Sequence, residues 1–465
     1  MQNIGIVGMS IMGRNLALNF ERQGYKVSIF NRTHKKFKKI LSKNNKKKII
    51  PYFTIKSFIL SLNKPKIILL MLKAGKHIDN IIKSFKPFLE KGDIIIDGGN
   101  SFYKDTIKRC NQLSLKNIYF IGAGISGGEE GALYGPSIMP GGSKKAYNII
   151  FPILKKISAK FNNKPCINYI GPNGSGHYLK MIHNGIEYSD MQIISESYII
   201  LKKILNLSNS EISNIFKNWN SGELNSYLTE ITYKIFNKKD KNGLYIIDII
   251  LDEAYHKNTV KWLIKDSLET EEPLTIISSS LFARYLSSMK NQRINASKVL
   301  YGPNKKFNLK KSNNIIEDLR RSFYLSRILS YSQAFSQLKK SSKKYSWKIN
   351  FENIIDIFSS GCIIRSKLFK KIKNIYKKNI KIDNLLLSKY FIKISKKYQN
   401  SLRNIINLSV KNGIPIPAFY NSIAYYDSYR SFKLPANLIQ AQRDYFGSHS
   451  YKRIDKSGFY HTKWI

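Results

Sequence analysis

The sequence predicts an α/β Rossmann-type N-terminal domain, followed by a large all-α domain and a C-terminal tail. Three observations support this prediction. Short apolar runs alternate with glycine-rich turns in the first third of the chain, strand signals fade from about Gly174 onward, and residues 448–465 are polar and aromatic with no clear period. A chain of 465 residues also exceeds what one core holds. We therefore expect a domain at residues 1–173, a helical domain at 174–433 and a tail at 434–465.

The first expected element is a strand that leads into a glycine turn. Ile4–Val7 is apolar, residues 14–23 have a helical pattern, and Lys26–Phe30 alternates like a second strand. This order is the context of a dinucleotide-binding fingerprint, in which backbone N–H groups at the positive helix end approach a pyrophosphate. Ser10 replaces the usual middle glycine but is small, and the alternative is a tight turn without a ligand. The candidate cofactor residues in the turn are Gly8, Met9, Ser10, Ile11, Met12 and Gly13.

The end of the second strand indicates which dinucleotide is bound. The chain has Asn31-Arg32-Thr33 there. An NAD site usually has a carboxylate at this point for the ribose hydroxyls, and a carboxylate would repel a 2′-phosphate. A guanidinium and a hydroxyl attract that phosphate, so we predict NADP. The alternative is that Arg32 is one more cation in a very basic chain.

Further apolar runs end in glycine-rich polar loops. In open α/β sheets ligands lie beyond the carboxyl ends of the strands, and glycines there let backbone donors face a carboxylate or hydroxyl. We also expect a rigid turn region at residues 135–142. The alternative is that these loops are glycine-rich for turn geometry alone. The runs are Lys66–Leu72, Asp93–Ile96 and Ile118–Ile121, and the loops that follow them begin at Lys73, Asp97 and Gly122.

A polar stripe on one helix is the most informative feature of the chain. Its members fall at positions i, i+3, i+4, i+7 and i+8, which share one face of an α-helix. A base, an acid, an imidazole, an amide and a phenol are groups suited to proton transfer and to holding a polyol or sugar acid. The alternative is a solvated helix face with ordinary ion pairs. The stripe consists of Lys180, His183, Asn184, Glu187 and Tyr188.

The remaining helical segments define the second domain. We expect a short helix from Leu434 to about Gly447 and an aromatic tail that docks on another surface, for which a neighbouring subunit is a natural candidate. The expected helices of the domain are residues 178–205, 210–216, 223–236, 244–254, 273–289, 315–337, 351–359 and 385–412.

The formal charge of +48 raises the question of a nucleic-acid partner. The lysines are spread over distant runs, such as residues 34–39, 43–48 and 339–348, that alternate with Ile and Asn. They therefore indicate a drift of the whole composition, with lysines on exposed helix faces. We expect no specific nucleic-acid binding, although such a field attracts anionic small molecules.

The cysteines and the hydropathy point to a cytoplasmic protein. The three cysteines are far apart and show no zinc, redox or disulfide spacing, so no metal site is expected. We expect no signal peptide, and the longest apolar run, Ile67–Leu72, is too short to cross a membrane.

Taken together, the motifs resemble the decarboxylating 6-phosphogluconate dehydrogenase family over essentially the whole chain. The likeness lies in the helical stripe, the Asn31-Arg32-Thr33 turn, the loops at 73–75 and 97–101, SGGEEGALYGPSIMPGG at 126–142 and RDYFG at 443–447. The resemblance implies oxidation of 6-phosphogluconate with NADP in the pentose phosphate pathway, with release of CO2 and ribulose 5-phosphate. It also implies a metal-free homodimer whose C-terminal tail enters the partner's active site.

The resemblance also implies residue roles. Lys180 is the general base and Glu187 the general acid. Asn31, Arg32 and Thr33 hold the 2′-phosphate. Cofactor contacts also come from Leu72, Lys73, Ala74 and Asn100. The substrate is held by Asn100, Ser126, Gly127, Gly128, His183, Asn184, Tyr188, Lys257, Thr259 and Arg284, and by Arg443 and His449 from the other subunit.

The chain departs from the family pattern mainly in one loop. Asn258 and Val260 stand where glycines are usual, so we expect altered substrate affinity there. A second enzyme reading is another β-hydroxyacid dehydrogenase with a small unphosphorylated substrate, which would not need the cations Lys257, Arg284 and Arg443. A degenerate dehydrogenase fold that binds nucleic acid is the non-enzyme alternative.

Overall fold

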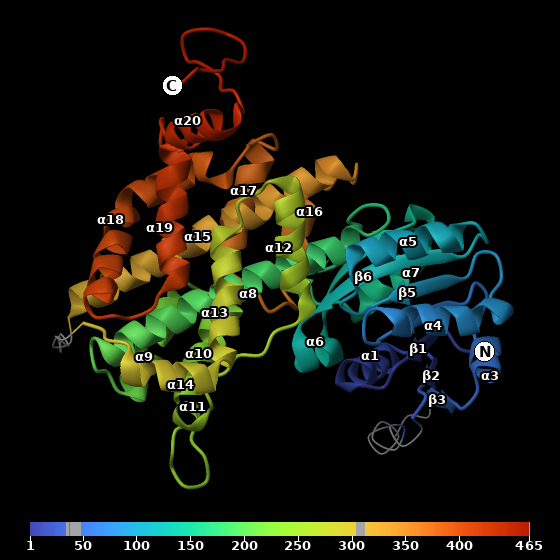
Figure 1. Cartoon of the computed structure of the whole chain (residues 1–465). Coiled ribbons are helices and arrows are strands. Elements are labelled where there is room, and N and C mark those ends of the chain that lie inside the picture. Colours follow the sequence, from blue (N-terminus) through green and yellow to red (C-terminus); the bar gives the residue numbers. More distant parts are fainter. Residues whose placement is uncertain (34–36, 38–47, 304–311, 465) are drawn as a thin grey trace.

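The computed structural model describes residues 1–33, 37, 48–303 and 312–464, and it has two main parts (Figure 1). A sheet flanked by helices forms the N-terminal part, and a larger array of helices follows. Helix α8 (Ser175–Lys203) begins beside the sheet and runs into the middle of the helical part. The last helix, α20 (Ala436–Gly447), and the tail after it project from the helical part, far from the sheet.

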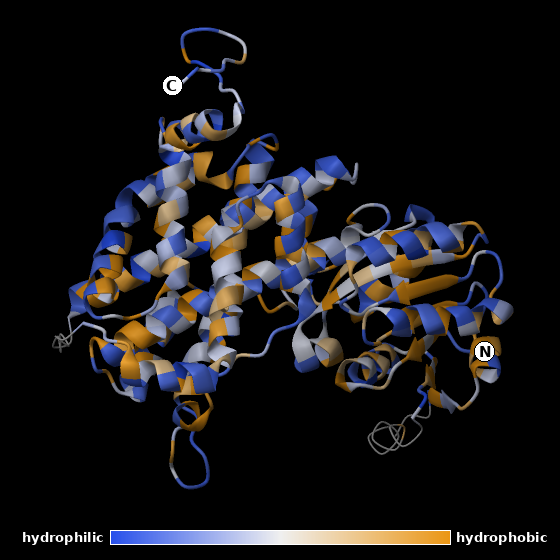
Figure 2. Ribbon diagram, viewed as in Figure 1, coloured by the Kyte–Doolittle hydropathy of each residue, from blue (hydrophilic) through white to orange (hydrophobic). Residues whose placement is uncertain are grey.

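The sheet has seven strands in the order β3-β2-β1-β4-β5-β6-β7. The first six are parallel and β7 is antiparallel to β6. The central strands are buried apolar runs covered by helices on both faces (Figure 2). The strands are β1 (Ile4–Val7), β2 (Val27–Phe30), β3 (Ile49–Tyr52), β4 (Ile67–Leu70), β5 (Ile94–Asp97), β6 (Tyr119–Ser126) and β7 (Ser137–Gly142). The helices are α1 (Ile11–Arg22), α3 (Ile55–Leu60), α4 (Lys76–Phe85), α5 (Tyr103–Ser114), α6 (Gly128–Tyr134) and α7 (Lys144–Ile157), with a 3-10 turn, η1, at Lys86–Phe88.

The prediction of a rigid turn at 135–142 is wrong from Ser137 onward, because residues Ser137–Gly142 form strand β7. Strand β6 also continues past the predicted end at Ile121, through the glycines that we assigned to a loop, and it pairs with β7 from Ile121↔Gly142 to Ser126↔Ser137. Glycines hid both elements, because they lack the side-chain alternation that marks a strand. A side chain on Gly141 would lie 2.3 Å from the backbone nitrogen of Gly176, so the glycine is needed for α8 to pack on β7.

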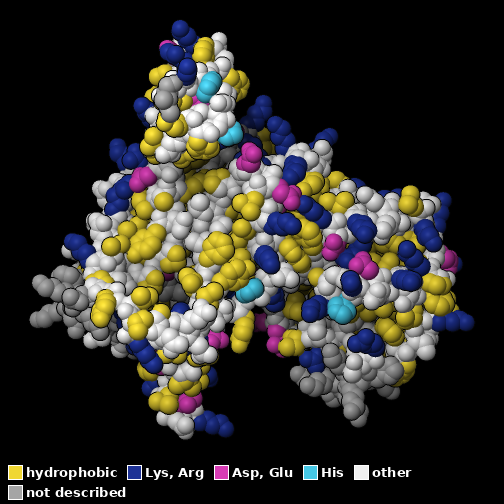
Figure 3. Space-filling view, in the orientation of Figure 1, with side chains coloured by type: hydrophobic (Ala, Val, Ile, Leu, Met, Phe, Trp, Pro, Cys, Tyr) yellow, Lys and Arg dark blue, Asp and Glu magenta, His cyan; other side chains and the backbone are white. Residues whose placement is uncertain are grey.

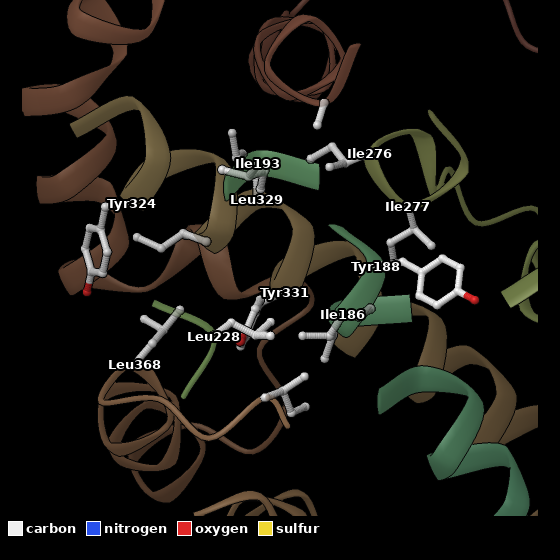
Figure 4. Close-up of a cluster of buried hydrophobic side chains, with 14 of the residues drawn as sticks. Ile186, Tyr188, Ile193, Leu228, Ile276, Ile277, Tyr324, Leu329, Tyr331 and Leu368 are labelled. Atoms are coloured by element: carbon white, nitrogen blue, oxygen red, sulfur yellow. The ribbon is translucent and has the colours of Figure 1, made fainter. Parts of the chain in front are cut away.

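The helical part surrounds α8 with long helices. Its core is visible in Figure 4, where side chains of α8, α13 and α15 interleave. A buried ion pair joins two of these helices, because Arg327 Nε lies 3.0 Å from Asp190 Oδ1. The helices are α9 (Asn209–Ser221), α10 (Tyr227–Phe236), α11 (Ile246–Ile249), α12 (Asn258–Thr270), α13 (Thr275–Ser288), α14 (Lys290–Val299), α15 (Asn313–Lys344), α16 (Phe351–Phe358), α17 (Leu368–Lys378), α18 (Lys389–Lys411) and α19 (Pro417–Arg430).

Two helical predictions need correction. Residues 244–254 form only the short α11, because the backbone turns extended at Ile250 and the side chains of Ile249, Ile250 and Leu251 are exposed and have no core to pack on. The helix expected at 385–412 begins with a separate 3-10 turn, η2 (Leu385–Leu387), and α18 starts after the Ser388 cap. We also missed α12, since its first turn was assigned to a loop.

The tail has local structure of its own. Asp444 is fully buried, and its carboxylate accepts hydrogen bonds from the backbone nitrogens of Ser450 and Thr462 and from the Trp464 indole. Tyr451 and Tyr460 form a small antiparallel bridge. The Asp444 carboxylate therefore ties several parts of the tail to α20, and Gln440 of the same helix adds a hydrogen bond to the Ser450 carbonyl.

Lys and Arg side chains are scattered over both parts of the face in Figure 3 and do not gather into one patch. The basic runs at 34–39 and 43–48 lie almost entirely outside the described residues. No helix in the described part of the chain is long and apolar enough to cross a bilayer.

Candidate active site

The polar stripe faces the place where α8 meets the sheet. The N-terminal half of α8 packs on β6 and β7. Gly124 of β6 permits this approach, because a side chain there would lie 2.6 Å from Cβ of Lys180. In Figure 3 the surface is hollowed between the two parts of the molecule. Helix packing thus brings the stripe to the carboxyl edge of the sheet.

The stripe is buried, so the alternative of a solvated helix face is wrong. His183 is 0% exposed and Lys180 is 7% exposed. Asn184 and Tyr188 are also buried, and the Glu187 side chain keeps 24% of its surface accessible. A polar stripe is left in such surroundings only where its groups bond one another or a ligand.

The stripe residues contact one another and the strand end. Lys180 Nζ lies 3.5 Å from His183 Nδ1, and Glu187 Oε2 lies 3.6 Å from the same nitrogen. On the other side of the imidazole, His183 Nε2 is hydrogen-bonded to Ser126 Oγ at 3.0 Å. The amine and the carboxyl group therefore flank one imidazole, which the end of β6 orients.

Burial shifts the pKa values of these groups in directions that suit proton transfer. Burial lowers the pKa of Lys180, with a contribution from Lys257, while the Glu187 carboxylate opposes the shift. Burial raises the pKa of Glu187, and the nearby cations partly offset this. Burial and the Lys180 amine lower the pKa of His183 well below its usual value. Each shift makes the form suited to proton transfer easier to reach than in water: the free amine, the protonated carboxyl group and the neutral imidazole.

Helices α12 and α13 close the site on the far side of the stripe. Lys257 is the N-cap residue of α12, and its backbone nitrogen donates to the Tyr188 hydroxyl at 3.0 Å. Asn184 Nδ2 donates to Thr259 Oγ1 at 2.9 Å. The Arg284 guanidinium lies 3.6 Å from the centre of the Tyr188 ring. Two cations and two hydroxyls therefore gather at this end, as an anionic group requires.

A cavity of about 590 Å³ follows the carboxyl ends of β1 and β2. Asn31, Arg32 and Thr33 line it together with Gly8, Leu72 and Lys73. A second cavity, of about 630 Å³, shares Leu72 and Lys73 with the first and reaches Ala74, Asn100, Lys257 and Thr259. The two cavities together run from the predicted 2′-phosphate site to Lys257 at the start of α12, which fits an extended dinucleotide.

The glycine turn has the geometry of a dinucleotide cradle. Gly8 has φ +97°, and a side chain on Gly13 would lie 1.9 Å from the Gly8 carbonyl oxygen. The Met9 nitrogen donates to Asn31 Oδ1 at 3.0 Å, which ties the turn to the end of β2. Ser10 is the N-cap of α1 and makes no side-chain cap bond, and Ile11 and Met12 begin the helix.

Two predicted residues are not brought to this site within one chain. Arg443 lies on α20 and is exposed, with Nη1 donating to Gln440 on the same helix. His449 follows that helix and contacts Phe446. In Figure 1 α20 lies far from the start of α8. Gly127 and Gly128, by contrast, lie at the end of β6 in positive-φ conformations that begin α6.

Sequence reasoning missed several residues around the site. Cys362 is buried close enough to Lys180 to influence the pKa of the amine, and Gly361 accepts a backbone hydrogen bond from Ser137. His256 and Trp262 line the second cavity. Nothing in the sequence joins Cys362 to α8. In the described residues no cluster of His, Cys, Asp and Glu has a geometry that could hold a metal ion.

A parallel sheet of this order binds dinucleotides at its carboxyl edge, and a buried amine there serves proton transfer. Together these features define the class of dinucleotide-dependent dehydrogenases. Comparison with known proteins is more specific. The family described as the NAD binding domain of 6-phosphogluconate dehydrogenase matches residues 3–171, and the family described as 6-phosphogluconate dehydrogenase, C-terminal domain, matches residues 176–464. The chain belongs to the 6-phosphogluconate dehydrogenase family.

Individual relatives agree over the full length. The chain is 58% identical to "6-phosphogluconate dehydrogenase, decarboxylating" from Buchnera aphidicola subsp. Acyrthosiphon pisum, covering 100% of this chain and 99% of that protein. It is 55% identical to the protein of the same name from Escherichia coli, with the same coverage. Among solved structures, Plasmodium falciparum 6-phosphogluconate dehydrogenase, described as apo and in complex with NADP+ and 6-phosphogluconate, matches with a TM-score of 0.93. That match has 43% identity and covers 99% of this chain and 100% of the other.

Proposed function

We propose that the protein oxidises 6-phospho-D-gluconate with NADP and releases CO2 and D-ribulose 5-phosphate. It is thus an oxidoreductase of the pentose phosphate pathway. The observation that carries this proposal is the pair Lys180 and Glu187, which flanks His183 on α8. The same stripe adjoins the second cavity, because its Asn184 donates to Thr259, which lines that cavity. Full-length similarity to decarboxylating relatives supports the substrate.

Lys180 acts as the general base. NADP, when bound, supplies the acceptor for the hydride lost from C3. The lowered pKa of Lys180 leaves a fraction of the amine neutral, so it can take the proton from the C3 hydroxyl. The resulting ammonium then stabilises the negative charge that develops on the C3 oxygen as CO2 leaves. One amine thus serves both steps.

Glu187 acts as the general acid. Loss of CO2 from a β-keto acid leaves an enediol that must be protonated at C1. The raised pKa of Glu187 keeps its carboxyl group protonated to higher pH than usual, so the proton is available. Remaining access to solvent, 24% of the side chain, lets the group regain its proton between turnovers.

The other site residues bind the substrate. We assign Lys257, Thr259, Arg284 and Tyr188 to the 6-phosphate, because two cations and two hydroxyls converge there. Binding at this remote group orients the reacting carbon over the base. The acid end and the hydroxyls are assigned to Asn100, Ser126, Gly127, Gly128, His183 and Asn184.

The organisation of the protein is also part of the proposal. We propose domains at 1–173, 174–433 and 434–465, and a homodimer in which Arg443 and His449 reach the partner's site. Exposed aromatic side chains on α20 and the tail, such as Tyr445 and Phe446, support a docked tail. We propose a cytoplasmic location, because the three thiols are free and a reducing compartment preserves them.

A purified-protein assay tests the activity. Incubation with 6-phosphogluconate and NADP should yield NADPH and CO2 in equal amounts. Turnover of a short unphosphorylated β-hydroxyacid in preference to 6-phosphogluconate would favour the other dehydrogenase reading. Nucleic-acid affinity that falls steeply with salt, without any turnover, would favour the non-enzyme reading.

Glu187→Gln is expected to lower kcat about 100-fold while leaving the hydride step intact, because an amide cannot donate the proton to C1. Stopped-flow mixing should then show a fast burst of NADPH followed by a slow steady state. The control is Glu269→Gln, which removes a carboxylate paired with the exposed Lys104 and Lys344 and should leave the kinetics unchanged. A steady state equal to that of the unmodified enzyme would contradict the role of Glu187.

Arg32→Gln is expected to raise KM for NADP about 30-fold and to leave KM for NAD unchanged, because the lost charge-assisted hydrogen bond faces only the 2′-phosphate. Initial rates with both cofactors measure this. Arg22→Gln is the matched control, since Arg22 lies exposed on the same domain and bonds Asn19 and the Tyr134 carbonyl. Equal losses with NADP and NAD would refute the assignment.

A further inference from the structure

Two loops form the sheet side of the second cavity, and the buried side chain of Arg109 contacts residues at the ends of both. The first loop, Leu72–Gly75, follows β4, and the second, Gly98–Ser101, follows β5. Ala74 and Asn100, one from each loop, line the cavity together with Lys257 and Thr259. The relative placement of these loops therefore sets the distance between the cofactor site and the groups on α12.

Arg109 of α5 contacts the first loop. Its side chain is 3% exposed, and Nη2 donates to the Gly75 carbonyl at 3.2 Å. Nε donates to Asp79 Oδ1, in the first turn of α4, at 2.7 Å. Gly75 is the N-cap of α4 and has φ +88°. The guanidinium thus fixes both the end of the loop and the start of the helix after it.

The same guanidinium faces the second loop through Asp97. Nη1 lies 3.7 Å from Asp97 Oδ2, and among the described residues it has no hydrogen-bond acceptor of its own. Asp97 is fully buried and shapes its loop, since its oxygens accept from the Gly99 nitrogen at 3.0 Å and from Ser101 Oγ at 2.6 Å. The Asp97 carbonyl is bonded to His177 of α8 at 3.1 Å.

The loops also touch each other directly, which makes their alignment sensitive. A side chain on Gly99 would lie 2.8 Å from the Leu72 carbonyl oxygen. A shift of either loop therefore displaces the other. A guanidinium is planar and always charged, so it can hold several hydrogen-bond acceptors at fixed angles. The ammonium group of a lysine cannot reproduce this geometry.

We propose that Arg109 is a positioning residue for the reaction: it holds the Leu72–Gly75 and Gly98–Ser101 loops in the register that places the nicotinamide end of the cofactor against the substrate. Arg109 touches neither reactant itself. This inference rests on the proposed dehydrogenase function for its kinetic consequence, but its effect on cofactor binding can be measured without any turnover.

The test uses Arg109→Lys, which keeps the charge but loses the fork, and Asp79→Asn, which loosens only the α4 side. The Asp79 side chain is 55% exposed, so its replacement leaves the buried packing intact. Lys64→Gln is the control, because Lys64 belongs to an exposed pair of the same domain. Binding of NADPH is followed by its fluorescence, and turnover is followed with 6-phosphogluconate that carries hydrogen or deuterium at C3.

For Arg109→Lys we expect about tenfold weaker NADPH binding, a fall in kcat of about tenfold or more, and a larger deuterium isotope effect, because the hydride is transferred over a poorer geometry. Asp79→Asn should shift all three in the same direction by less, and Lys64→Gln should shift none. The proposal would be overturned if NADPH binding and the isotope effect were unchanged in both Arg109→Lys and Asp79→Asn. It would also be overturned if the losses of binding and turnover in these variants only matched the fraction of protein that is unfolded. A different outcome separates the two proposals. If Arg109→Lys binds NADPH more weakly but the unmodified protein does not turn over 6-phosphogluconate, the positioning role of Arg109 is supported and the proposed function is refuted.

Discussion

Lys180→Met should reduce kcat about 1,000-fold, because the reaction then lacks both its base and the cation that stabilises the developing enolate. Methionine is close to lysine in length and is apolar, and Lys180 is only 7% exposed, so the fold should be retained. NADPH formation in a continuous assay measures the loss. NADPH should still bind, because the Lys180 amine acts in the reaction and does not belong to the cofactor site at Asn31–Thr33.

The control for this substitution is Lys203→Met, which removes an exposed lysine from the same helix. We expect no kinetic change there. The pH dependence adds a second check. Because burial lowers the pKa of Lys180, the neutral base is available at lower pH than for an ordinary lysine, so kcat/KM should rise with pH through that lowered pKa. Full turnover by Lys180→Met would show that the stripe is a structural feature alone.

Mixing two impaired variants should restore activity if the tail acts across a dimer. Lys180→Met lacks the base, and Arg443→Ala lacks a proposed phosphate ligand. In a mixed dimer the site with an intact Lys180 receives the intact Arg443 from the partner, whereas the other site has both defects. Random reassociation gives mixed dimers in half of the cases, so about one quarter of the normal activity should return. The assay uses 6-phosphogluconate well below KM, where loss of a phosphate ligand is most visible.

A matched control decides whether the recovery comes from complementation. Lys180→Met mixed with the double variant Lys180→Met/Arg443→Ala has no intact base in any dimer and should stay inactive. If Arg443 served its own chain, each site of the mixed dimer would carry one defect and no recovery would follow. The same result is expected of a monomer, so absence of recovery would end the proposal of an intersubunit tail.

The stripe on α8 was predictable because helical periodicity is local. Five polar groups at i, i+3, i+4, i+7 and i+8 share a face whatever the helix packs against. The Rossmann-type order of strand, glycine turn and helix is also local. The role of the Asn31–Thr33 turn could be predicted from its position directly after β2 alone. These features identified the family before any long-range contact was known.

Other elements depended on partners that lie far away in the sequence. Strand β7 consists of Ser-Ile-Met-Pro-Gly-Gly, which has turn composition, and it is a strand because β6 supplies its hydrogen bonds. The first turn of α12 was assigned to a loop from the family resemblance, but Val260 is fully buried in the helical core and holds the segment as a helix. In β7, packing overrode the local preference of the residues.

The sequence by itself determined the overall fold class, the order of the cofactor motifs and the set of groups able to move a proton, because all three follow from residue type and spacing. Only the tertiary structure decided that Lys180 and Glu187 are buried around one imidazole, that Lys257 and Arg284 meet Tyr188, and that Arg109 lies beneath two cofactor loops. The physical reason is that burial and charge neighbours, which set pKa values and alignment, arise from residues separated by tens to hundreds of positions, and no local pattern encodes those contacts.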